Sequence, residues 1–415
     1  MPFQYLTNFP LDEAAQTYLD ALASRGLTYK TETIPVTATL GRITAQAVYA
    51  KICAPHYNAC AMDGIALDAS KTFGASETTP ARLRESDFVR VDTGDPLPAG
   101  CDAVVMIEDV IEENGQVSLY APAVPWENIR QIGEDISAGD MIVPSFTAVT
   151  PACMGAMLAA GVMQLEVVKR PLVGIIPTGD EIVPPTENPG AGDIIEFNST
   201  IFSGMLIQWG CQTKVYPIVR DDQNLIEAAL RLGLAECDAL ILNAGSSAGS
   251  EDYSAQAMRS VGEVVLHGIA IKPGKPAVLG FAPAKDLKDV IPVLGVPGYP
   301  VSGILVLERI FKPVVDLLTC RVADQVSEID AVISRRLTSS LKYREFVRAR
   351  LGKVGGKLVA VPLNRGAGVV SSFVKADGII DIPQDTEGYE AGENVRVRLM
   401  RSMDEIERTL VITGS

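Results

Sequence analysis

The sequence predicts a multidomain α/β plus β protein whose central part is a doubly wound α/β/α domain. From Arg170 onward, strands that are apolar on both faces alternate with helices of about 10 to 13 residues, and this alternation is typical of a parallel sheet covered by helices. The expected strands lie in PLVGIIPTGDEI, KVYPIV and DALILNAG. The expected helices lie in NSTIFSGMLIQWG, in NLIEAALRLGLAE and from about Asp252.

The length of the chain predicts three or four domains, because 415 residues exceed what one hydrophobic core can serve. Leu11, Ala15, Tyr18, Leu19 and Leu22 have helical spacing, which predicts an amphipathic helix. From residue 46 to about 144, short apolar runs are broken by Gly, Pro, Asp and Asn, which predicts a β-rich insertion between helical stretches. Beyond residue 320, KLVAVPL, GIIDIP and NVRVRLM predict a small C-terminal β domain.

The net charge argues against nucleic acid as a partner. Lys and Arg number 36 against 51 Asp and Glu, so the formal charge is −15 and the average field repels polyanions. Residues 331–370 are the exception, with nine basic side chains and one acidic side chain. Such a segment suits a small anionic ligand or an acidic partner, and it equally suits a face that docks on another domain of the chain.

Cysteine and histidine usage excludes several site types. The seven cysteines form no CxxC pair, which argues against a disulfide framework or a zinc ribbon. With only His56 and His267, little material exists for a histidine-rich metal site or a catalytic triad.

The N-terminal segment has no basic stretch followed by an apolar run, so we expect no signal peptide and a cytoplasmic location. The uncharged segment 141–165 is broken by prolines and glycines, with Thr150 as helix N-cap and Pro151 at the first helical position. We therefore expect a short buried helix there, and no membrane span.

The segment NAGSSAGSEDYS joins a buried strand to a helix and suits a phosphate group. Its glycines allow close approach of backbone N–H groups, its serines add hydroxyl donors, and the helix N-terminus adds positive potential. The candidate binding residues are Gly245, Ser246, Ser247, Gly249 and Ser250. A Gly/Ser-rich turn that is only a connection remains an alternative.

Two lysines flank a Pro-Gly turn in IKPGKPAVLGF. Lys272 and Lys275 repel each other unless an anion lies between them, and lysine is a common phosphate binder. An exposed turn without a ligand is the ordinary alternative. A second Pro/Gly-shaped turn, GVPGYPVSG, follows in the same domain and favours the site.

Carboxylates recur at expected strand and turn ends. Oxygen ligands of this kind hold Mg²⁺ together with substrate phosphates, and they also serve in acid/base steps. A single Asp in a turn is more often a turn former or a cap, so the number of such positions carries the prediction. The positions are Asp63, Asp92, Asp135, Asp180, Glu181, Asp221, Asp222 and Asp252.

Eight segments in order resemble the molybdopterin molybdenumtransferase family, the molybdenum insertases that include the C-terminal domain of gephyrin. They are YNACAMDGIA, VDTGDPLPAGCDAVVMIED, GEDISAGD, RPLVGIIPTGDEIV, NAGSSAGSEDYS, IKPGKPAVLGF, GVPGYPVSG and VVSSFVKADGIIDIP. The resemblance spans nearly the whole chain. It implies a helical linking domain (1–45 and 145–169), an inserted β domain (46–144), a molybdopterin-binding α/β domain (170–325) and a C-terminal β barrel (326–415).

The activity that the resemblance implies is insertion of molybdate, or tungstate, into adenylylated molybdopterin with Mg²⁺ and release of AMP. The resemblance also implies a homodimer with its site between the central domain of one subunit and the inserted domain of the other. Implied partners are the adenylyltransferase of the preceding step and cofactor-accepting enzymes. Two other functions stay open, namely the adenylyltransferase reaction itself and a non-catalytic pterin- or oxyanion-binding scaffold.

By the same resemblance, six residues are expected to line the reaction site, and Glu181, Asp221 and Asp252 among them to hold the metal. The six are Asp63, Thr93, Asp135, Glu181, Asp221 and Asp252. The expected nucleotide-binding residues are Lys272, Lys275, Pro297, Pro300, the Ser/Gly turn and Arg348. The chain departs from the family pattern at Cys60, in the turn Ser246–Ser250, at Tyr299 and at Ala367, which leaves the accepted metal and pterin form open.

Overall fold

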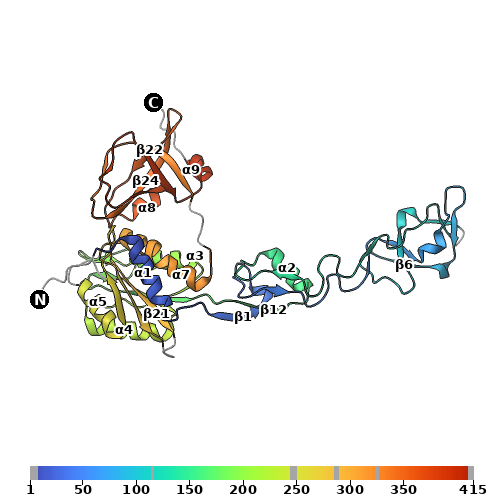
Figure 1. Cartoon of the computed structure of the whole chain (residues 1–415), viewed down its shortest axis with the longest axis horizontal. Coiled ribbons are helices and arrows are strands. Elements are labelled where there is room, and N and C mark those ends of the chain that lie inside the picture. The colour runs from blue at the N-terminus through green and yellow to red at the C-terminus, as the bar shows by residue number, and fades with distance from the viewer. Residues whose placement is uncertain (1–7, 114–115, 244–249, 285–288, 323–326, 410–415) are drawn as a thin grey trace. The chain divides into compact units, whose positions relative to one another are not determined.

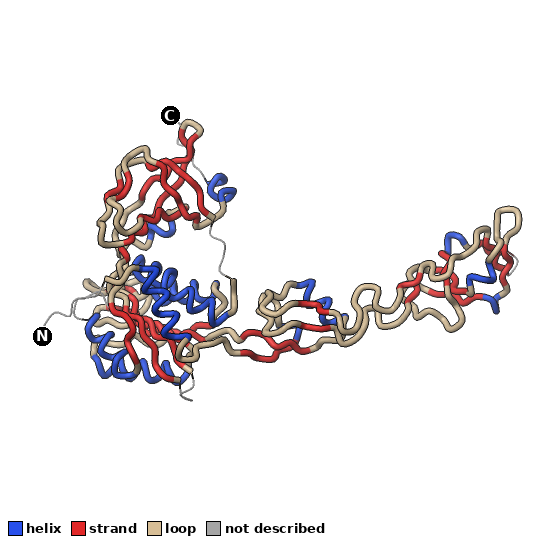
Figure 2. The backbone as a smooth tube through the Cα atoms, viewed as in Figure 1, coloured by secondary structure: helices blue, strands red, loops and turns tan. Residues whose placement is uncertain are grey.

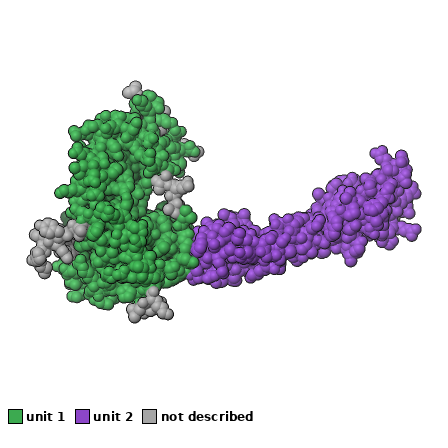
Figure 3. Space-filling model, in the orientation of Figure 1, with its two compact units in different colours: residues 1–30, 169–415 green, residues 31–168 purple. Residues whose placement is uncertain are grey.

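The computed structural model describes residues 8–113, 116–243, 250–284, 289–322 and 327–409 of the chain. These residues form two compact units (Figure 3). Unit 1 comprises Met1–Lys30 and Lys169–Ser415, and unit 2 comprises Thr31–Val168. Each unit is described by itself below.

The centre of unit 1 is a six-stranded sheet in the order β16-β13-β17-β21-β20-β18. Four strands are parallel: β16 (Gln212–Val215), β13 (Leu172–Pro177), β17 (Ala239–Asn243) and β21 (Val290–Val296). This part confirms the predicted doubly wound sheet. However, β20 (Val278–Pro283) and β18 (Glu263–His267) are antiparallel, because the links 268–277 and 284–289 are shorter than a parallel crossover requires.

Helices cover both faces of this sheet, as in Figure 1. Apolar residues of α4 (Gln223–Glu236) and α5 (Ser250–Val261) pack against one face. The other face is covered by α1 (Leu11–Ala23), α3 (Asn198–Gln208), α6 (Pro300–Val306) and α7 (Lys312–Thr319). A π-helical turn, η5 (Leu307–Phe311), joins α6 to α7, and the short β14 (Ile182–Val183) pairs with β15 (Ile194–Ile195).

The helix α1 belongs to unit 1, whereas the predicted linking domain placed residues 1–45 with 145–169. Leu11, Tyr18 and Leu22 are buried in the core beneath the central sheet. The hydroxyl of Tyr18 donates a hydrogen bond of 2.8 Å to the carbonyl oxygen of Gly280 in β20. The apolar face of α1 was correctly predicted, but its burial partner is the central sheet.

The C-terminal part of unit 1 is the predicted β barrel. Five strands close into a ring in the order β24-β25-β22-β28-β26, with β26 paired to β24. Their bounds are β22 (Glu328–Ile333), β24 (Arg344–Val354), β25 (Lys357–Pro362), β26 (Gly378–Ile382) and β28 (Asn394–Leu399). Smaller elements are β23 (Leu337–Thr338), β27 (Gly388–Tyr389), α8 (Ser371–Lys375) and α9 (Met403–Thr409).

One very short strand joins the two halves of unit 1. The strand β19 (Ile271–Lys272) lies in the link between β18 and β20 and pairs in parallel with β24 of the barrel. Lys272 is the register partner of Glu345, and the backbone N–H of Arg344 donates to the carbonyl oxygen of Ala270 at 2.9 Å. The lysine-bearing turn is therefore held by the barrel.

In its described residues, unit 2 consists of short antiparallel strands, one α-helix and a few short 3-10 helices (Figure 2). Three strand pairs follow one another: β1 (Thr31–Pro35) with β12 (Gln164–Val168), β2 (Val48–Tyr49) with β11 (Met141–Val143), and β3 (Ala59–Cys60) with β10 (Ile129–Arg130). Two three-stranded sheets follow, β6-β4-β7 and β5-β9-β8. Their bounds are β4 (Gly64–Leu67), β5 (Ala81–Leu83), β6 (Phe88–Val91), β7 (Ala103–Met106), β8 (Ile111–Glu113) and β9 (Gln116–Leu119).

The helix of unit 2, α2 (Pro151–Ala159), begins as the sequence predicts. The Thr150 side chain accepts a hydrogen bond from the backbone N–H of Cys153, and Pro151 occupies the first turn. Met157 packs in a small core with Val143 and Val149. Within the described ranges, no helix is both long and apolar enough to cross a membrane.

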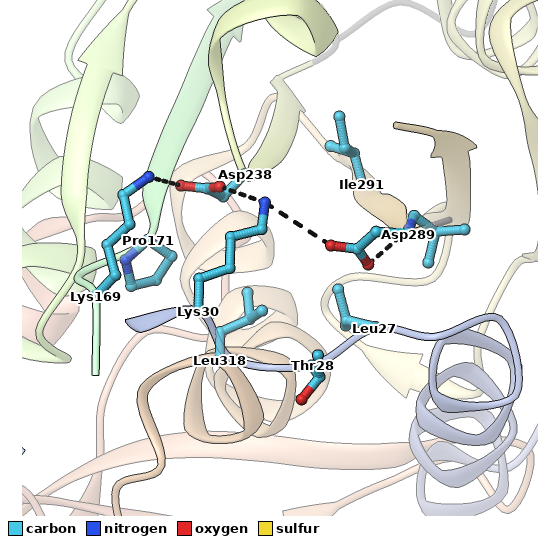
Figure 4. Close-up of a pocket in the computed structure, with 10 residues that line it drawn as sticks. Leu27, Thr28, Lys30, Lys169, Pro171, Asp238, Asp289, Ile291 and Leu318 are labelled. Atoms are coloured by element: carbon cyan, nitrogen blue, oxygen red, sulfur yellow. Dashed lines mark hydrogen bonds and ion pairs between the residues drawn. The ribbon is translucent and has the colours of Figure 1, made fainter. Parts of the chain in front are cut away.

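Lys30 and Lys169, the residues of unit 1 at its two connections to unit 2, form ion pairs with Asp238 (Figure 4). Asp238 lies 3.0 Å from the Lys30 ammonium and 3.6 Å from that of Lys169, and it accepts the backbone N–H of Leu172. Burial opposes ionisation of Asp238, but these hydrogen bonds and charges outweigh burial and lower its pKa. The cavity beside this cluster is only about 20 Å³, enough for one water molecule.

The packing of α6 on α3 can be tested with two glycines. A Cβ on Gly303 in α6 would lie 2.4 Å from Cζ of Phe202, whereas a Cβ on Gly204 in α3 would meet nothing within 4 Å. We expect Gly303→Ala to lower the free energy of unfolding by about 1–3 kcal/mol. The control Gly204→Ala is expected to raise it by about 0.5–1 kcal/mol. Equal unfolding midpoints for both variants in urea would contradict the close packing.

Candidate active site

The parallel strands of unit 1 end at one edge of the sheet, where their following loops meet. The backbone N–H of Thr178 donates to the carbonyl oxygen of Asn243 at 2.9 Å, and that of Gly179 donates to Val219 at 3.0 Å. The segment after β13 therefore lies beside the segment that precedes α4 and the end of β17. Ligands of open α/β sheets bind at this edge.

Three carboxylates gather there. Burial raises the pKa of Asp221, and the neighbouring carboxylates of Asp180 and Glu181 raise it further. The Oδ1 atom of Asp221 is buried and has no hydrogen-bond partner among the described residues. Asp222, one residue later, caps α4 by accepting the backbone N–H groups of Asn224 and Leu225. The two aspartates of the VRDD motif thus have different surroundings, and Asp221 is the one suited to a cation or a proton.

The metal site expected from Glu181, Asp221 and Asp252 stays a prediction. Among the described side chains, no group of three His, Cys, Asp or Glu residues is arranged to hold a metal ion. Asp252 and Ser250 belong to the first turn of α5, but their side chains lie outside the description. Gly245, Ser246, Ser247 and Gly249 also lie outside the described residues. The elements on either side are the expected buried strand and helix, β17 and α5.

Asn198, at the start of α3, also lies at this edge of the sheet, although its sequence position gives no indication of it. Its side chain is buried, and the Nδ2 group donates to the carbonyl oxygen of Gly298 at 2.7 Å and to Oδ1 of Asn243 at 3.5 Å. It therefore links the end of β17 to the loop that follows β21. A polar residue at a helix start has no special sequence signal, because most such residues are caps.

A cavity of about 390 Å³ opens beside this loop. The predicted Lys272, Lys275 and Pro297 line it, and Pro300 is buried at the start of α6. Gly274, between the lysines, has a φ of +126°, and a Cβ there would approach Val306 to 3.0 Å. The other lining residues are Ile271, Pro273, Gly274, Pro276, Gly298, Tyr299, Ser302, Tyr343 and Ala367.

Both lysines have neighbours that orient them. The Lys275 ammonium lies 5.9 Å from the ring centre of Tyr343, within the range of a cation–π contact. The Lys272 ammonium lies 3.7 Å from Oε2 of Glu345, and its side chain is 50% exposed. The cavity therefore offers two ammonium groups and aromatic walls from Tyr299 and Tyr343. These features suit a ligand with a planar ring and a phosphate.

Arg348, expected to contact an anion, is 1% exposed. Its guanidinium donates to Oγ of Ser372 and to the carbonyl oxygens of Phe346, Asn364 and Gly366. These bonds direct its donors into the barrel, so we leave Arg348 out of the proposed binding site. The basic stretch around it is partly neutralised, since four of its nine basic side chains form ion pairs: Arg336, Arg344, Lys353 and Arg365.

In unit 2, two of the three expected site residues lie together. Oδ1 of Asp63 accepts the backbone N–H of Thr93 at 2.6 Å and its hydroxyl at 2.8 Å. These two bonds lower the pKa of Asp63, so the exposed carboxylate is ionised at neutral pH. Asp135 is exposed in a different segment, which pairs with Ala54 through backbone hydrogen bonds.

Three family models match the chain in order. Residues 9–161 match the MoeA N-terminal region (domains I and II), residues 174–316 match a probable molybdopterin binding domain, and residues 330–400 match the MoeA C-terminal region (domain IV).

Relatives match over nearly their whole length. A protein of Methanocaldococcus jannaschii named for molybdopterin biosynthesis is 34% identical over 90% of this chain and 93% of its own. The molybdopterin molybdenumtransferase of Bacillus subtilis is 28% identical over 95% of both chains. A crystal structure of a molybdopterin biosynthesis MoeA protein from Pyrococcus horikoshii is 29% identical and covers 95% of this chain and 100% of that chain, with a TM-score of 0.77.

These matches cover the helical and inserted regions, the α/β domain with its cavity, and the barrel. The resemblance read from the eight sequence segments is thereby confirmed. The chain belongs to the molybdopterin molybdenumtransferase (MoeA) family.

Proposed function

We propose that this chain is a molybdopterin molybdenumtransferase that inserts molybdate, or tungstate, into adenylylated molybdopterin and releases AMP. The observation that supports this most directly is the cavity with Lys272 and Lys275, because two ammonium groups there match the charged phosphates of a pterin nucleotide. The hydrogen bonds of Asn198 to Gly298 and Asn243 connect the loop that lines this cavity with the strand ends where the carboxylates lie.

The two groups of residues have separate roles in this proposal. Lys272 and Lys275 attract the phosphates in the ground state and in the transition state alike, which provides binding. Glu181, Asp221 and Asp252 would hold Mg²⁺, for which carboxylate oxygens are suitable ligands, and the buried Oδ1 of Asp221, which has no partner among the described residues, supports that choice. A bound cation would neutralise charge on the phosphoanhydride as it breaks.

The finer parts of the proposal extend beyond the α/β domain. We propose that the protein acts as a cytoplasmic homodimer, with Asp63, Thr93 and Asp135 of one subunit completing the site of the other. The Ser/Gly turn of Gly245, Ser246, Ser247, Gly249 and Ser250 would contact phosphate. The adenylyltransferase of the preceding step and cofactor-accepting enzymes are the proposed protein partners.

The direct test follows AMP release by the purified protein. Adenylylated molybdopterin is supplied with Mg²⁺, with and without molybdate or tungstate. We expect AMP to appear only with an oxyanion, at a rate that depends on its concentration. Consumption of ATP with molybdopterin alone would favour the adenylyltransferase reaction instead, and binding without AMP release would favour a scaffold.

Adjacent aspartates provide a matched test of the carboxylate roles. Asp221→Asn and Glu181→Gln are expected to slow AMP release by roughly 10²- to 10⁴-fold while nucleotide binding is kept. Asp222→Asn makes the same charge change one residue away, but Asn caps a helix as well as Asp. Its rate should stay near that of the wild type. If all three variants turn over equally, the assigned reaction site is wrong.

Mixed dimers test whether the site is shared between subunits. We would unfold and refold together a subunit carrying Asp63→Asn and a subunit carrying Glu181→Gln, each inactive alone. If the proposal holds, random pairing restores about a quarter of the wild-type rate, because half of the dimers then contain one intact site. The control pairs Asp63→Asn with Asp135→Asn, which leaves every site defective. Recovery in the control, or none in the test mixture, would contradict a shared site.

A further inference from the structure

Glu345 is a buried carboxylate that touches the ligand cavity through Lys272. It lies on β24 opposite Lys272 in β19, and only 2% of it is exposed. Its Oε1 atom accepts the Nε–H of Arg365 at 2.7 Å, and Nη2 of Arg365 bonds to the same atom. Its Oε2 atom accepts the hydroxyl of Ser339 at 2.8 Å, and the Lys272 ammonium lies 3.7 Å from that atom.

The contacts of Glu345 are unequal. The two bonds from Arg365 are charge-assisted, whereas the separation from Lys272 is longer than a hydrogen bond. Arg365 is itself held by a bond of 2.8 Å from Nη1 to the carbonyl oxygen of Thr338. The charge of Glu345 is therefore balanced mainly by Arg365, and half of the Lys272 side chain stays exposed to the cavity.

A buried carboxylate without a charged partner lowers the stability of the fold, because its charge has lost solvation. It therefore attracts the nearest available cation. If Arg365 were absent, Lys272 would be that cation. Arg348 is also near, but the bonds that it makes go to Ser372 and to carbonyl oxygens, so it does not replace Arg365. With the charge of Glu345 balanced by Arg365, the ammonium groups of Lys272 and Lys275 both remain available to an anion.

We propose that Arg365 is a positioning residue, which by engaging Glu345 keeps Lys272 available for anionic ligand. In this arrangement, Arg365 acts through Glu345 and has no need to touch the ligand. The inference rests on the proposed function only in that it takes Lys272 as an anion-binding residue. It gives Arg365 and Glu345 indirect roles in ligand binding that the number of basic residues alone does not indicate.

The test uses AMP as the probe and measures its dissociation constant for the full-length protein by calorimetry. Arg365→Met should weaken AMP binding by roughly 3- to 10-fold, because Glu345 then captures Lys272. The double variant Arg365→Met, Glu345→Gln should return to within about twofold of the wild type, because no charge is left to capture the lysine. In a Lys272→Met background, Arg365→Met should have no further effect.

Each outcome decides the proposal. A double variant as weak as Arg365→Met would mean that Arg365 contacts the ligand directly, which overturns a positioning role. If Lys272→Met binds AMP like the wild type, Lys272 is not an anion-binding residue, and the inference fails together with that part of the proposed site. If Lys272→Met weakens AMP binding but the double variant does not restore the wild-type dissociation constant, the inference about Arg365 fails and the anion-binding role of Lys272 stands.

Folding is checked by circular dichroism, since these residues are buried or half-buried. Should Arg365→Met fail to fold, Ser339→Ala provides a milder variant, because it removes one donor from Oε2 of Glu345 without a change in charge. It should weaken AMP binding in the same direction by a smaller factor, and Glu345→Gln should cancel that effect. Unchanged binding in Ser339→Ala would then contradict the proposal.

Discussion

The pairing of β19 with β24 is the constraint on which the proposed ligand site depends. Ile271 and Lys272 occupy a link between two strands of the central sheet, and Ile271 is buried in the core of unit 1. Parallel pairing with Arg344 and Glu345 attaches this link to the barrel. The cavity consequently has walls from both domains, with Pro297 and Gly298 from the α/β domain and Tyr343 and Ala367 from the barrel. A rigid turn presents its lysines at defined positions, which lowers the entropy lost when a ligand binds.

Charge is distributed unevenly around this constraint. The chain as a whole is acidic, and most of the basic residues near the barrel are engaged in ion pairs or buried bonds. The cavity retains the ammonium groups of Lys272 and Lys275, while carboxylates gather around Asp221 at the strand ends. An anionic nucleotide is attracted by the first group, and a cation by the second. The two groups together are suited to a reaction in which a phosphoanhydride is cleaved with the help of a divalent ion.

The sequence predicted the local structure well, because hydrophobic periodicity reports which face of an element is buried. It does not report the partner: Tyr18 of α1 packs beneath the central sheet, whereas the resemblance implied that residues 1–45 belong to the linking domain. It also does not report strand direction, and β18 and β20 proved antiparallel. The lysine pair was predicted from its turn, whereas the burial of Arg348, which the resemblance gave as an anion contact, has no signal in the sequence. The sequence did give one indication that Glu345 is paired. It is the single acidic residue in the basic stretch 331–370, and a lone opposite charge in such a stretch tends to form an ion pair.

A crystal structure of the protein with AMP and molybdate bound tests the central claim most directly, because it locates the ligand without dependence on turnover. The account predicts that the AMP phosphate lies in the cavity, within hydrogen-bond distance of the Lys272 or Lys275 ammonium group. It further predicts that Arg365 still engages Glu345 in that complex. Phosphate density at another surface, with the cavity between Tyr299 and Tyr343 free of ligand, would contradict the account.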